Sequence, residues 1–413
     1  MKARYIPFVA VIVSVLFITS CAKEQNKLLS KLPLSGSVML SPNGKRFARV
    51  VTDKGKQAVT VDGKMGKLYD AVGVGPVFSP DSKRLAYAAK IGEKWIVVVD
   101  GSESKAFLGI GAGTIVFSPD SRRLAFAAKV GSKWTVSVDG FSYGAFEDLI
   151  GGSMVFSHDG RHLAFATKSG DKQVMVVDAV AQKPYDALTS PPVFSKDGVR
   201  LAYSVREGGR QFVVLDGSEQ KKYDTVVSIP VFSTDGASVA YTADEGGKGR
   251  IVVNGIEKGV YEKVGSTVAF SLDGSQLAYV VQEGGKWSVA ISGKPGKQYD
   301  GIMVGSVVFS PGGRRMAYAA KQGDKWLVVA DDKEGKQYDG IAGGSLSFSP
   351  DGRHFAYAAQ SGKQKFVVID GKEGKPYANI LMSSGVAFDS PTSLHYLVID
   401  NKSLYLVKEN TGR

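Results

Sequence analysis

One pentapeptide has the residue types and spacing of a hydrolase nucleophile. Residues 140–144 (Gly-Phe-Ser-Tyr-Gly) match the G-x-S-x-G pattern, in which the serine stands on a sharp turn between a strand and a helix. Similar segments of the chain have Asp100-Gly101 and Asp370-Gly371 at this place, which are signals of a tight hairpin turn. Residues 145–147 match a strand in those segments, so a helix has no room to follow. The pattern therefore predicts a turn, with Ser142 outside any catalytic triad.

Histidines and aspartates recur in short segments, and both residue types could hold a metal ion. His158 and His162 are four residues apart, a spacing that suits zinc on a helix, but they lie in a Ser-His-Asp-Gly-Arg-His turn, and His354 repeats only the second position. Each recurring aspartate is alone in its turn, whereas calcium needs six or more oxygen ligands. We therefore expect these aspartates to bond to their own turns, and we predict no metal site and no cofactor. The aspartates are Asp81, Asp120, Asp159, Asp197, Asp235, Asp273 and Asp351.

Two further patterns are interpreted as structural. The glycine-rich residues 109–113 have no helix after them whose N-terminus could hold a phosphate, so they are expected to connect one repeated unit to the next. Tyr-Asp pairs near the end of several units are expected to pack along an outer strand. These pairs are Tyr69-Asp70, Tyr185-Asp186, Tyr223-Asp224, Tyr299-Asp300 and Tyr338-Asp339.

Lys-Trp pairs are the most suggestive candidates for binding. They begin a β-branched run in four similar segments, while other segments have glutamine, glycine or lysine at the tryptophan position, so the fold does not require the indole. Tryptophan beside a cation suits stacking on a sugar or a protein hot spot. The alternative is that each indole fills the hydrophobic gap between neighbouring units. The candidate residues are Lys94, Trp95, Lys133, Trp134, Lys286, Trp287, Lys325 and Trp326.

The segments that hold these residues are copies of one unit. A Phe-Ser-Pro-Asp motif, or a degenerate form of it, occurs ten times between Leu40 and Asp389 at steps of 38 to 40 residues. Each unit has a short apolar run, a turn, a Leu-Ala-Tyr run, a polar loop with glycine, a β-branched run and a Lys-x-Tyr-Asp segment. Four short strands in about 40 residues are typical of a β-propeller blade, so the sequence predicts an all-β propeller.

The motif Phe-Ser-Pro-Asp-Gly-Arg-x-Leu-Ala-Tyr resembles the WD-like repeat of TolB-type propellers, and the resemblance covers residues 27–413. It implies the fold and no particular activity. The last unit ends after its third strand, which would leave an open edge. Alignment places residues 27–32 where other units have the fourth strand, so we expect this segment to close a single ring of ten blades. Two five-bladed rings are the alternative.

The N-terminus is interpreted as a targeting segment. Lys2 and Arg4 precede an apolar stretch over residues 5–18, which is too short for a membrane span and fits a secretory signal. The next residues, Ile-Thr-Ser-Cys, resemble the lipobox of bacterial lipoproteins, in which the cysteine is diacylated and becomes the N-terminus. The resemblance implies a signal peptide over residues 1–20, an acylated Cys21, a tether over residues 21–26 and a propeller over residues 27–413. Ala22 after the cysteine favours the outer membrane, facing the periplasm. An ordinary signal peptide with an incidental cysteine is the alternative.

Composition narrows the function. The 413 residues are 43% apolar and 22% charged, which excludes wholesale disorder, and a single cysteine excludes internal disulfides. Without residues 1–20 the chain has 50 basic and 40 acidic side chains, a net charge of +10. A secreted protein does not normally meet nucleic acid. This positive charge therefore indicates either binding to polyanions of the cell envelope or a contribution to solubility. We therefore expect a lipid-anchored, non-catalytic envelope propeller that binds or scaffolds proteins. The alternatives are a lectin-like binder of polysaccharide or peptidoglycan, and a propeller-type hydrolase or lyase.

Overall fold

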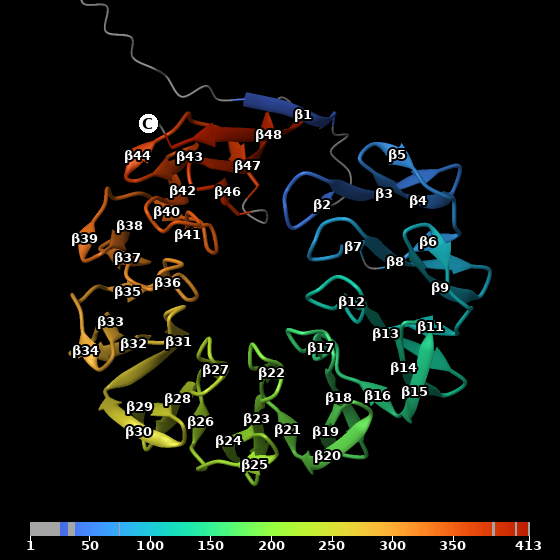
Figure 1. Cartoon of the computed structure of the whole chain (residues 1–413), viewed down its shortest axis with the longest axis horizontal. Coiled ribbons are helices and arrows are strands. Elements are labelled where there is room, and N and C mark those ends of the chain that lie inside the picture. The colour runs from blue at the N-terminus through green and yellow to red at the C-terminus, as the bar shows by residue number, and fades with distance from the viewer. Residues whose placement is uncertain (1–24, 32–37, 74, 382–384, 401–402, 412–413) are drawn as a thin grey trace, which may run out of the picture.

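The chain forms a ring of ten antiparallel sheets around a central opening (Figure 1). The computed structural model describes residues 25–31, 38–73, 75–381, 385–400 and 403–411. Within these ranges the regular structure is β-strand, and each sheet is one blade that follows its predecessor along the chain. The prediction of an all-β propeller with ten blades in one ring is confirmed, and the alternative of two five-bladed rings is wrong.

The strands of the first five blades run from the inner edge of each sheet to its outer edge in chain order. Blade 1 has β2 (Val38–Leu40), β3 (Phe47–Asp53), β4 (Lys56–Val61) and β5 (Lys64–Met65). Blade 2 has β6 (Ala71–Val72), β7 (Val77–Phe78), β8 (Leu85–Ile91), β9 (Lys94–Val99) and β10 (Ser102–Glu103). Blade 3 has β11 (Gly109–Ile110), β12 (Val116–Phe117), β13 (Leu124–Val130), β14 (Lys133–Val138) and β15 (Phe141–Phe146). Blade 4 has β16 (Asp148–Leu149), β17 (Val155–Phe156), β18 (Leu163–Ser169), β19 (Lys172–Val177) and β20 (Val180–Tyr185). Blade 5 has β21 (Ala187–Leu188), β22 (Val193–Phe194), β23 (Leu201–Glu207), β24 (Arg210–Leu215) and β25 (Ser218–Glu219).

The other five blades follow the same plan. Blade 6 has β26 (Thr225–Val226), β27 (Val231–Phe232), β28 (Val239–Glu245), β29 (Lys248–Val253) and β30 (Ile256–Tyr261). Blade 7 has β31 (Lys263–Phe270), β32 (Leu277–Glu283), β33 (Lys286–Ile291) and β34 (Lys294–Pro295). Blade 8 has β35 (Gly301–Ile302), β36 (Val308–Phe309), β37 (Met316–Gln322), β38 (Lys325–Ala330) and β39 (Lys333–Glu334). Blade 9 has β40 (Gly340–Ile341), β41 (Ser347–Phe348), β42 (Phe355–Ser361), β43 (Gln364–Ile369) and β44 (Lys372–Glu373). Blade 10 has β45 (Asn379–Ile380), β46 (Ala387–Ser390), β47 (Ser393–Asp400), β48 (Ser403–Asn410) and, from the other end of the chain, β1 (Gln25–Lys31).

The innermost strand of most blades is split in two, which the expected four-strand unit did not include. In blade 3 the residues between β11 and β12 bulge out of the sheet, and Thr114 Oγ1 donates to the Gly111 carbonyl at 2.8 Å. The same hydroxyl accepts from the Ala127 amide at 3.0 Å. The expectation that residues 109–113 connect two units is therefore wrong, because Gly109 already lies in a strand and the following glycines form the bulge.

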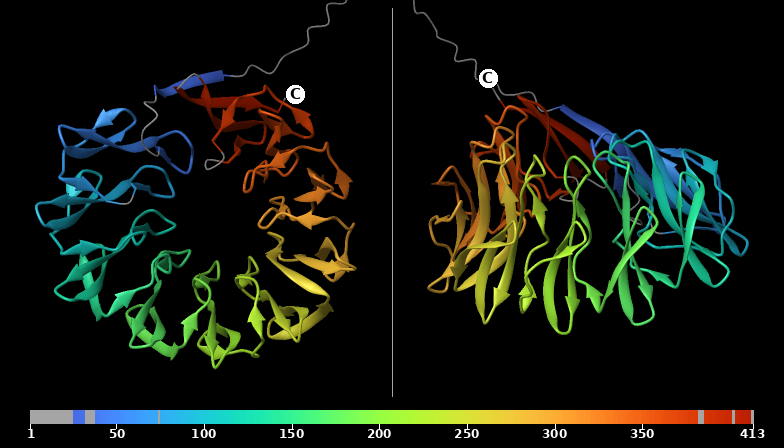
Figure 2. Two further views of the ribbon diagram at one scale, coloured as in Figure 1. Left: turned by 180° about the vertical axis from the view of Figure 1, so that it is seen from behind. Right: turned by 60° about the horizontal axis from the view of Figure 1, so that its bottom comes forward.

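The N-terminal strand closes the ring. β1 pairs antiparallel with β48, with Gln25 opposite Lys408 and Lys31 opposite Ser403, and from behind it lies along the last blade (Figure 2). The predicted closure by this segment is confirmed. The strand begins at Gln25 rather than Lys27, so it includes the last two residues of the expected tether, and Leu32 lies outside the described residues.

The hydrophobic core lies between neighbouring blades. Each cluster of buried side chains draws on two adjacent sheets, as where Tyr299 of blade 7 packs with Tyr318 and Leu327 of blade 8. Alternating residues of a strand point to opposite faces, so each sheet presents apolar residues to both neighbours. No helix in the described part of the chain is long and apolar enough to cross a membrane.

Candidate binding surfaces

The serine of the G-x-S-x-G pattern lies on an outer strand. Asp139 and Gly140 form the hairpin turn between β14 and β15, with φ angles of 52° and 90°, and Ser142 is an exposed residue of β15. The chain continues along β15 to Phe146, so no helix follows the serine, as the turn interpretation expected.

The recurring aspartates bond to their own turns. Asp81 Oδ1 accepts from Ser79 Oγ at 2.6 Å and from the Lys83 amide at 3.0 Å. The serine hydroxyl, followed by the backbone amide, holds the pKa of Asp81 below its usual value. The same Ser-Asp bond recurs in the other six turns, so the expected role of these aspartates is confirmed.

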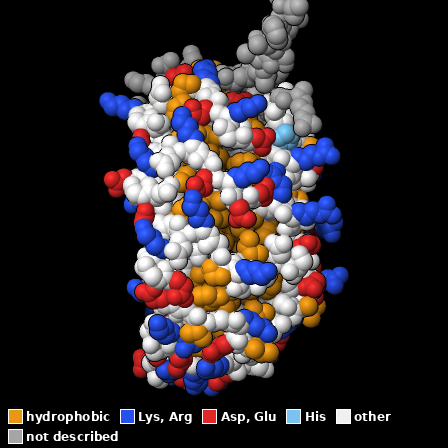
Figure 3. All heavy atoms as spheres, turned by 90° about the vertical axis from the view of Figure 1, so that its left-hand side faces the viewer, with side chains coloured by type: hydrophobic (Ala, Val, Ile, Leu, Met, Phe, Trp, Pro, Cys, Tyr) orange, Lys and Arg blue, Asp and Glu red, His pale blue; other side chains and the backbone are white. Residues whose placement is uncertain are grey.

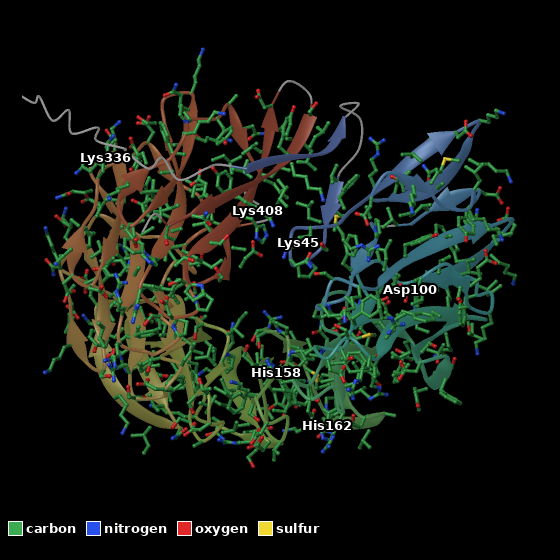
Figure 4. The ribbon with its side chains drawn as sticks, turned by 45° about the horizontal axis from the view of Figure 1, so that its top comes forward. Lys45, Asp100, His158, His162, Lys336 and Lys408 are labelled. Atoms are coloured by element: carbon green, nitrogen blue, oxygen red, sulfur yellow. The ribbon has the colours of Figure 1, made fainter. Side chains whose placement is uncertain are left out.

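The two histidines at four-residue spacing have different surroundings. His158 is exposed in the turn between β17 and β18, nearer to the central opening than His162 (Figure 4). His162 Nδ1 is 2.6 Å from Asp178 Oδ2, and His354 stands equally close to Asp370. Among the described residues, no three His, Cys, Asp or Glu side chains gather as metal ligands would.

Each tryptophan of the Lys-Trp pairs is half-buried at the junction with the next blade. Trp287 packs against the cluster shared by blades 7 and 8, and Trp326 against that of blades 8 and 9. In blade 1, where Gln57 has the tryptophan position, its Oε1 accepts at 2.7 Å from the amide of Val72 in blade 2. This position therefore faces the neighbouring blade. The four indoles lie at four different junctions and do not form one cluster.

Three of the four paired lysines have acidic partners. Lys286 Nζ is 2.5 Å from Asp300, Lys325 bonds to Asp339, and Lys133 is 3.9 Å from Glu147. The lysine bonds hold the pKa of Asp300 and of Asp339 below the usual value. These acids also accept from a glycine amide of the next blade, such as Gly323 at 2.7 Å from Asp300, so the lysines belong to an inter-blade contact.

Blade 2 departs from this pattern. Leu108 stands where the other three blades with a Lys-Trp pair have the acid, and no carboxylate contacts Lys94 in the described part of the chain. Trp95 here lies over Gly73, where an added Cβ would be 3.2 Å from the indole. The indole lines a groove of about 430 Å³ that extends to Ile110 and Ala112 of blade 3.

A second contact joins the outer strands, and we call it the latch. In the latch a lysine of one blade lies over an aromatic ring of its own segment and pairs with a glutamate of the next blade. Lys67 Nζ is 5.6 Å from the centre of the Tyr69 ring and 2.7 Å from Glu103 Oε1. The lysine and then the tyrosine hydroxyl lower the pKa of Glu103. The other latches are Lys183–Glu219, Lys221–Glu257, Lys297–Glu334 and Lys336–Glu373.

Three junctions among blades 1 to 9 lack the latch, and each has a groove. Between blades 3 and 4 the lysine and glutamate positions hold Gly144 and Ala181, and between blades 6 and 7 they hold Gly259 and Pro295. The grooves there measure about 160 Å³ and 350 Å³. Between blades 2 and 3 the lysine is kept as Lys105, and the groove is about 520 Å³.

The latch was not among the contacts predicted from the sequence. Its signal was present, because a glutamate follows the hairpin turn of several units, as in Asp100-Gly101-Ser102-Glu103 and Asp216-Gly217-Ser218-Glu219. Each glutamate lies 36 or 37 residues after its lysine. Cys21, the proposed lipidation site, and the signal peptide over residues 1–20 lie outside the described residues.

The ring and its junctions define this chain as a ten-bladed β-propeller. No protein-family model matches the chain, and no curated protein matches it. A eukaryotic initiation factor is 14% identical with a TM-score of 0.47, covering 80% of this chain and 94% of its own. The Dos1 propeller is 13% identical with a TM-score of 0.37, covering 95% of each chain. TolB from Acinetobacter baumannii is 17% identical with a TM-score of 0.29, covering 60% of this chain and 63% of its own. The blade count rests on the sheets of this chain alone.

Proposed function

We propose that this propeller is a non-catalytic protein-binding scaffold whose partner docks on the outer rim of blades 2 to 4. One observation carries the proposal: large apolar side chains are exposed there on β15 and β20, the two outer strands that meet at the unlatched junction of blades 3 and 4. Phe141 is 71% exposed, Val180 62% and Tyr143 41%. Aromatic residues are enriched in protein interfaces, and exposed apolar patches often mark them.

The opposite side of the ring supports this choice. Over blades 7 to 9, lysine and arginine are interspersed with aspartate and glutamate, and strips of hydrophobic side chains lie between these charges (Figure 3). On the outer strand of blade 8, Lys333 has the position that Phe141 has in blade 3, and its side chain is exposed. The same strand position is thus charged in a latched blade and aromatic in an unlatched one.

A photo-crosslinking amino acid at position 141 tests the proposal, with position 333 as the matched control. We expect a discrete crosslinked protein from position 141 in intact cells, lost when Tyr143→Ser is added, and none from position 333. Equal crosslinking from both positions, or none from either, would contradict docking at this rim.

The lipid anchor is part of the same proposal. The Ile-Thr-Ser-Cys pattern and Ala22 support acylation of Cys21 and a place on the outer membrane, facing the periplasm. Cys21→Ser is expected to move the protein from the membrane fraction to the soluble fraction. A Cys21→Ser protein that stays with membranes through a detergent-free wash would refute the anchor.

A second candidate function is supported by the groove at Trp95. An indole beside Lys94, which has no acidic partner in the described part of the chain, suits stacking on a sugar. Calorimetry with peptidoglycan fragments should then show binding that is lost in Trp95→Ala and kept in Trp326→Ala. Binding that is unchanged in Trp95→Ala would remove this candidate.

A further inference from the structure

The junction between blades 2 and 3 contains half of a latch. Lys105 Nζ lies 5.5 Å from the centre of the Phe107 ring, as the latch lysines lie over their tyrosines. The glutamate position of the next blade is Ser142, whose Oγ is 3.3 Å from Lys105 Nζ. Among the described residues this hydroxyl is the only hydrogen-bond partner of Lys105 Nζ. The cation of the latch is present without its carboxylate.

The rings at this junction are also different. The latched junction of blades 7 and 8 pairs Tyr299 with Tyr318 edge to face, whereas Phe107 pairs with Phe126 here at 5.8 Å between ring centres. Two hydroxyls and one carboxylate are therefore absent from the space that the latch fills elsewhere. The groove of about 520 Å³ occupies that place, with Phe107, Phe126 and Leu124 among its lining residues.

A buried hydroxyl lines this groove without a partner. Ser137 is 1% exposed, and its Oγ has no hydrogen-bond partner in the described part of the chain. The equivalent residues of blades 2, 4 and 8 are Val98, Val176 and Val329. An unpaired buried hydroxyl costs free energy that a bound polar group would recover.

The other charges of the groove are already paired. Arg84 Nε is 3.0 Å from Asp100, which Figure 4 labels on the ring. Glu103 is bound by Lys67, and Asp139 Oδ2 is 2.9 Å from Arg123 Nε. Lys105 is therefore the unneutralised charge of the groove, so the groove is complementary to one negative charge with an apolar flank.

We propose that this groove binds a glutamate or aspartate side chain of an extended segment of the partner protein. The carboxylate would pair with Lys105 and the segment would reach Ser137 Oγ, while the phenylalanine rings contact its apolar atoms. The other junctions of the chain indicate this occupant, because five of them place a glutamate of the next blade against the lysine equivalent to Lys105. The groove is far larger than one carboxylate, which favours a peptide over a small acid. This inference rests on the proposed function and names the chemistry of its partner.

Selection of a random dodecapeptide phage library against the purified propeller tests the inference. We expect enrichment of glutamate or aspartate at one position, and a selected peptide whose Glu→Gln form binds roughly tenfold more weakly or worse, the usual effect of a lost charge-assisted hydrogen bond. Lys105→Met should weaken binding of the acidic peptide to the same extent, and Lys297→Met, which removes a latch lysine at the junction of blades 7 and 8, should not.

Ser142→Glu provides a second test that does not remove a side chain. The substitution restores the latch within the chain, so the new carboxylate should pair with Lys105 and exclude the peptide. The melting temperature should stay the same or rise. Selection without acidic enrichment, or acidic peptides that bind Lys105→Met and Ser142→Glu as well as the parent, would overturn the inference.

The source of the carboxylate and the docking rim are tested separately. Butyrate that binds as tightly as the selected peptide would overturn the assignment to a protein segment. If the peptide experiments fail but crosslinking from position 141 is still observed, this inference is overturned and the proposed function stands. Failure of both the peptide experiments and the crosslinking would overturn this inference and the proposed function.

Discussion

Blades 2 and 3 and blades 7 and 8 carry the same Lys-Trp pairs and differ in how their outer strands meet the next blade. At the junction of blades 7 and 8, Lys297 pairs with Glu334 at 2.7 Å. At the junction of blades 2 and 3, Lys105 Nζ is 3.3 Å from the hydroxyl of Ser142 instead of a carboxylate. Both junctions keep an edge-to-face ring pair beneath this polar layer.

The difference separates what the fold needs from what it can change. Ring pairs and aliphatic side chains between blades are buried and supply most of the stability, since burial of apolar area dominates folding. The latch lies near solvent, where an ion pair contributes at most about 1 kcal/mol. Outer-strand residues can therefore be replaced at little cost, which is where a repeat protein gains a binding surface.

Opening the ring has the largest expected effect. It also shows which sector of the ring is less stable, blades 2 to 4 or blades 7 to 9. A variant lacking residues 1–31 loses β1 and its pairing with β48, and at roughly 1 kcal/mol for each hydrogen bond the loss is several kcal/mol. Its melting temperature should fall by many degrees, and limited proteolysis should cut first in blades 2 to 4. The matched control begins at Gln25. First cuts in blades 7 to 9 would contradict the proposed difference between the sectors.

Trp326→Ala and Trp95→Ala compare one residue type in the two sectors. Trp326 packs against the cluster of blades 8 and 9, so its loss should cost about 3 kcal/mol of unfolding free energy, the low end for a Trp→Ala change. Trp95 borders a groove, and its loss should cost about 1 kcal/mol. Denaturant unfolding measures both values. Equal costs would assign both indoles to packing alone.

Exchanging the latch residues is expected to have smaller, opposite effects. Glu334→Gln should lower the unfolding free energy by about 0.2 to 1 kcal/mol, the range for solvent-exposed ion pairs. Ser142→Glu should raise it by a similar amount, because Lys105 gains a carboxylate. Calorimetric melting of both variants and of the parent protein measures the two changes in unfolding free energy. A Ser142→Glu protein less stable than the parent would show that the groove cannot accept the latch.

The pH dependence of stability is the finest test. The contact with Lys297, whose Nζ is 2.7 Å from Glu334 Oε1, lowers the pKa of Glu334 from its ordinary value of 4.5. A carboxylate with a lowered pKa in the folded state stabilises the protein above its unfolded pKa, and this contribution is lost as the pH falls through the folded pKa. Melting temperatures should therefore drop below about pH 4.5, and Glu334→Gln should drop slightly less than the parent. An identical acid profile for both proteins would exclude a titrating latch.

The fold could be predicted from the sequence because its determinants are local and repeated. The Phe-Ser-Pro-Asp turn forms through bonds between residues two to five apart, such as Ser79 with Asp81 and Arg84, so every copy repeats the same signal. The missing fourth strand of the last unit and the matching N-terminal segment predicted the closure. The split inner strand was missed, because a Gly-rich segment predicts a bulge and a loop equally well.

The sequence by itself determined the blade, its number of copies and the way in which the ring closes. Only the tertiary structure decided which blade-to-blade contacts are complete, because a latch joins residues 36 or 37 apart that no local pattern connects. Lys105 looks like every other lysine of its type in the sequence, and Ser142 looks like part of a G-x-S-x-G motif. Packing two blades together places these two side chains opposite each other and opens a groove beside the buried Ser137 hydroxyl. It leaves Lys105 without a negative partner among the residues that the structure describes.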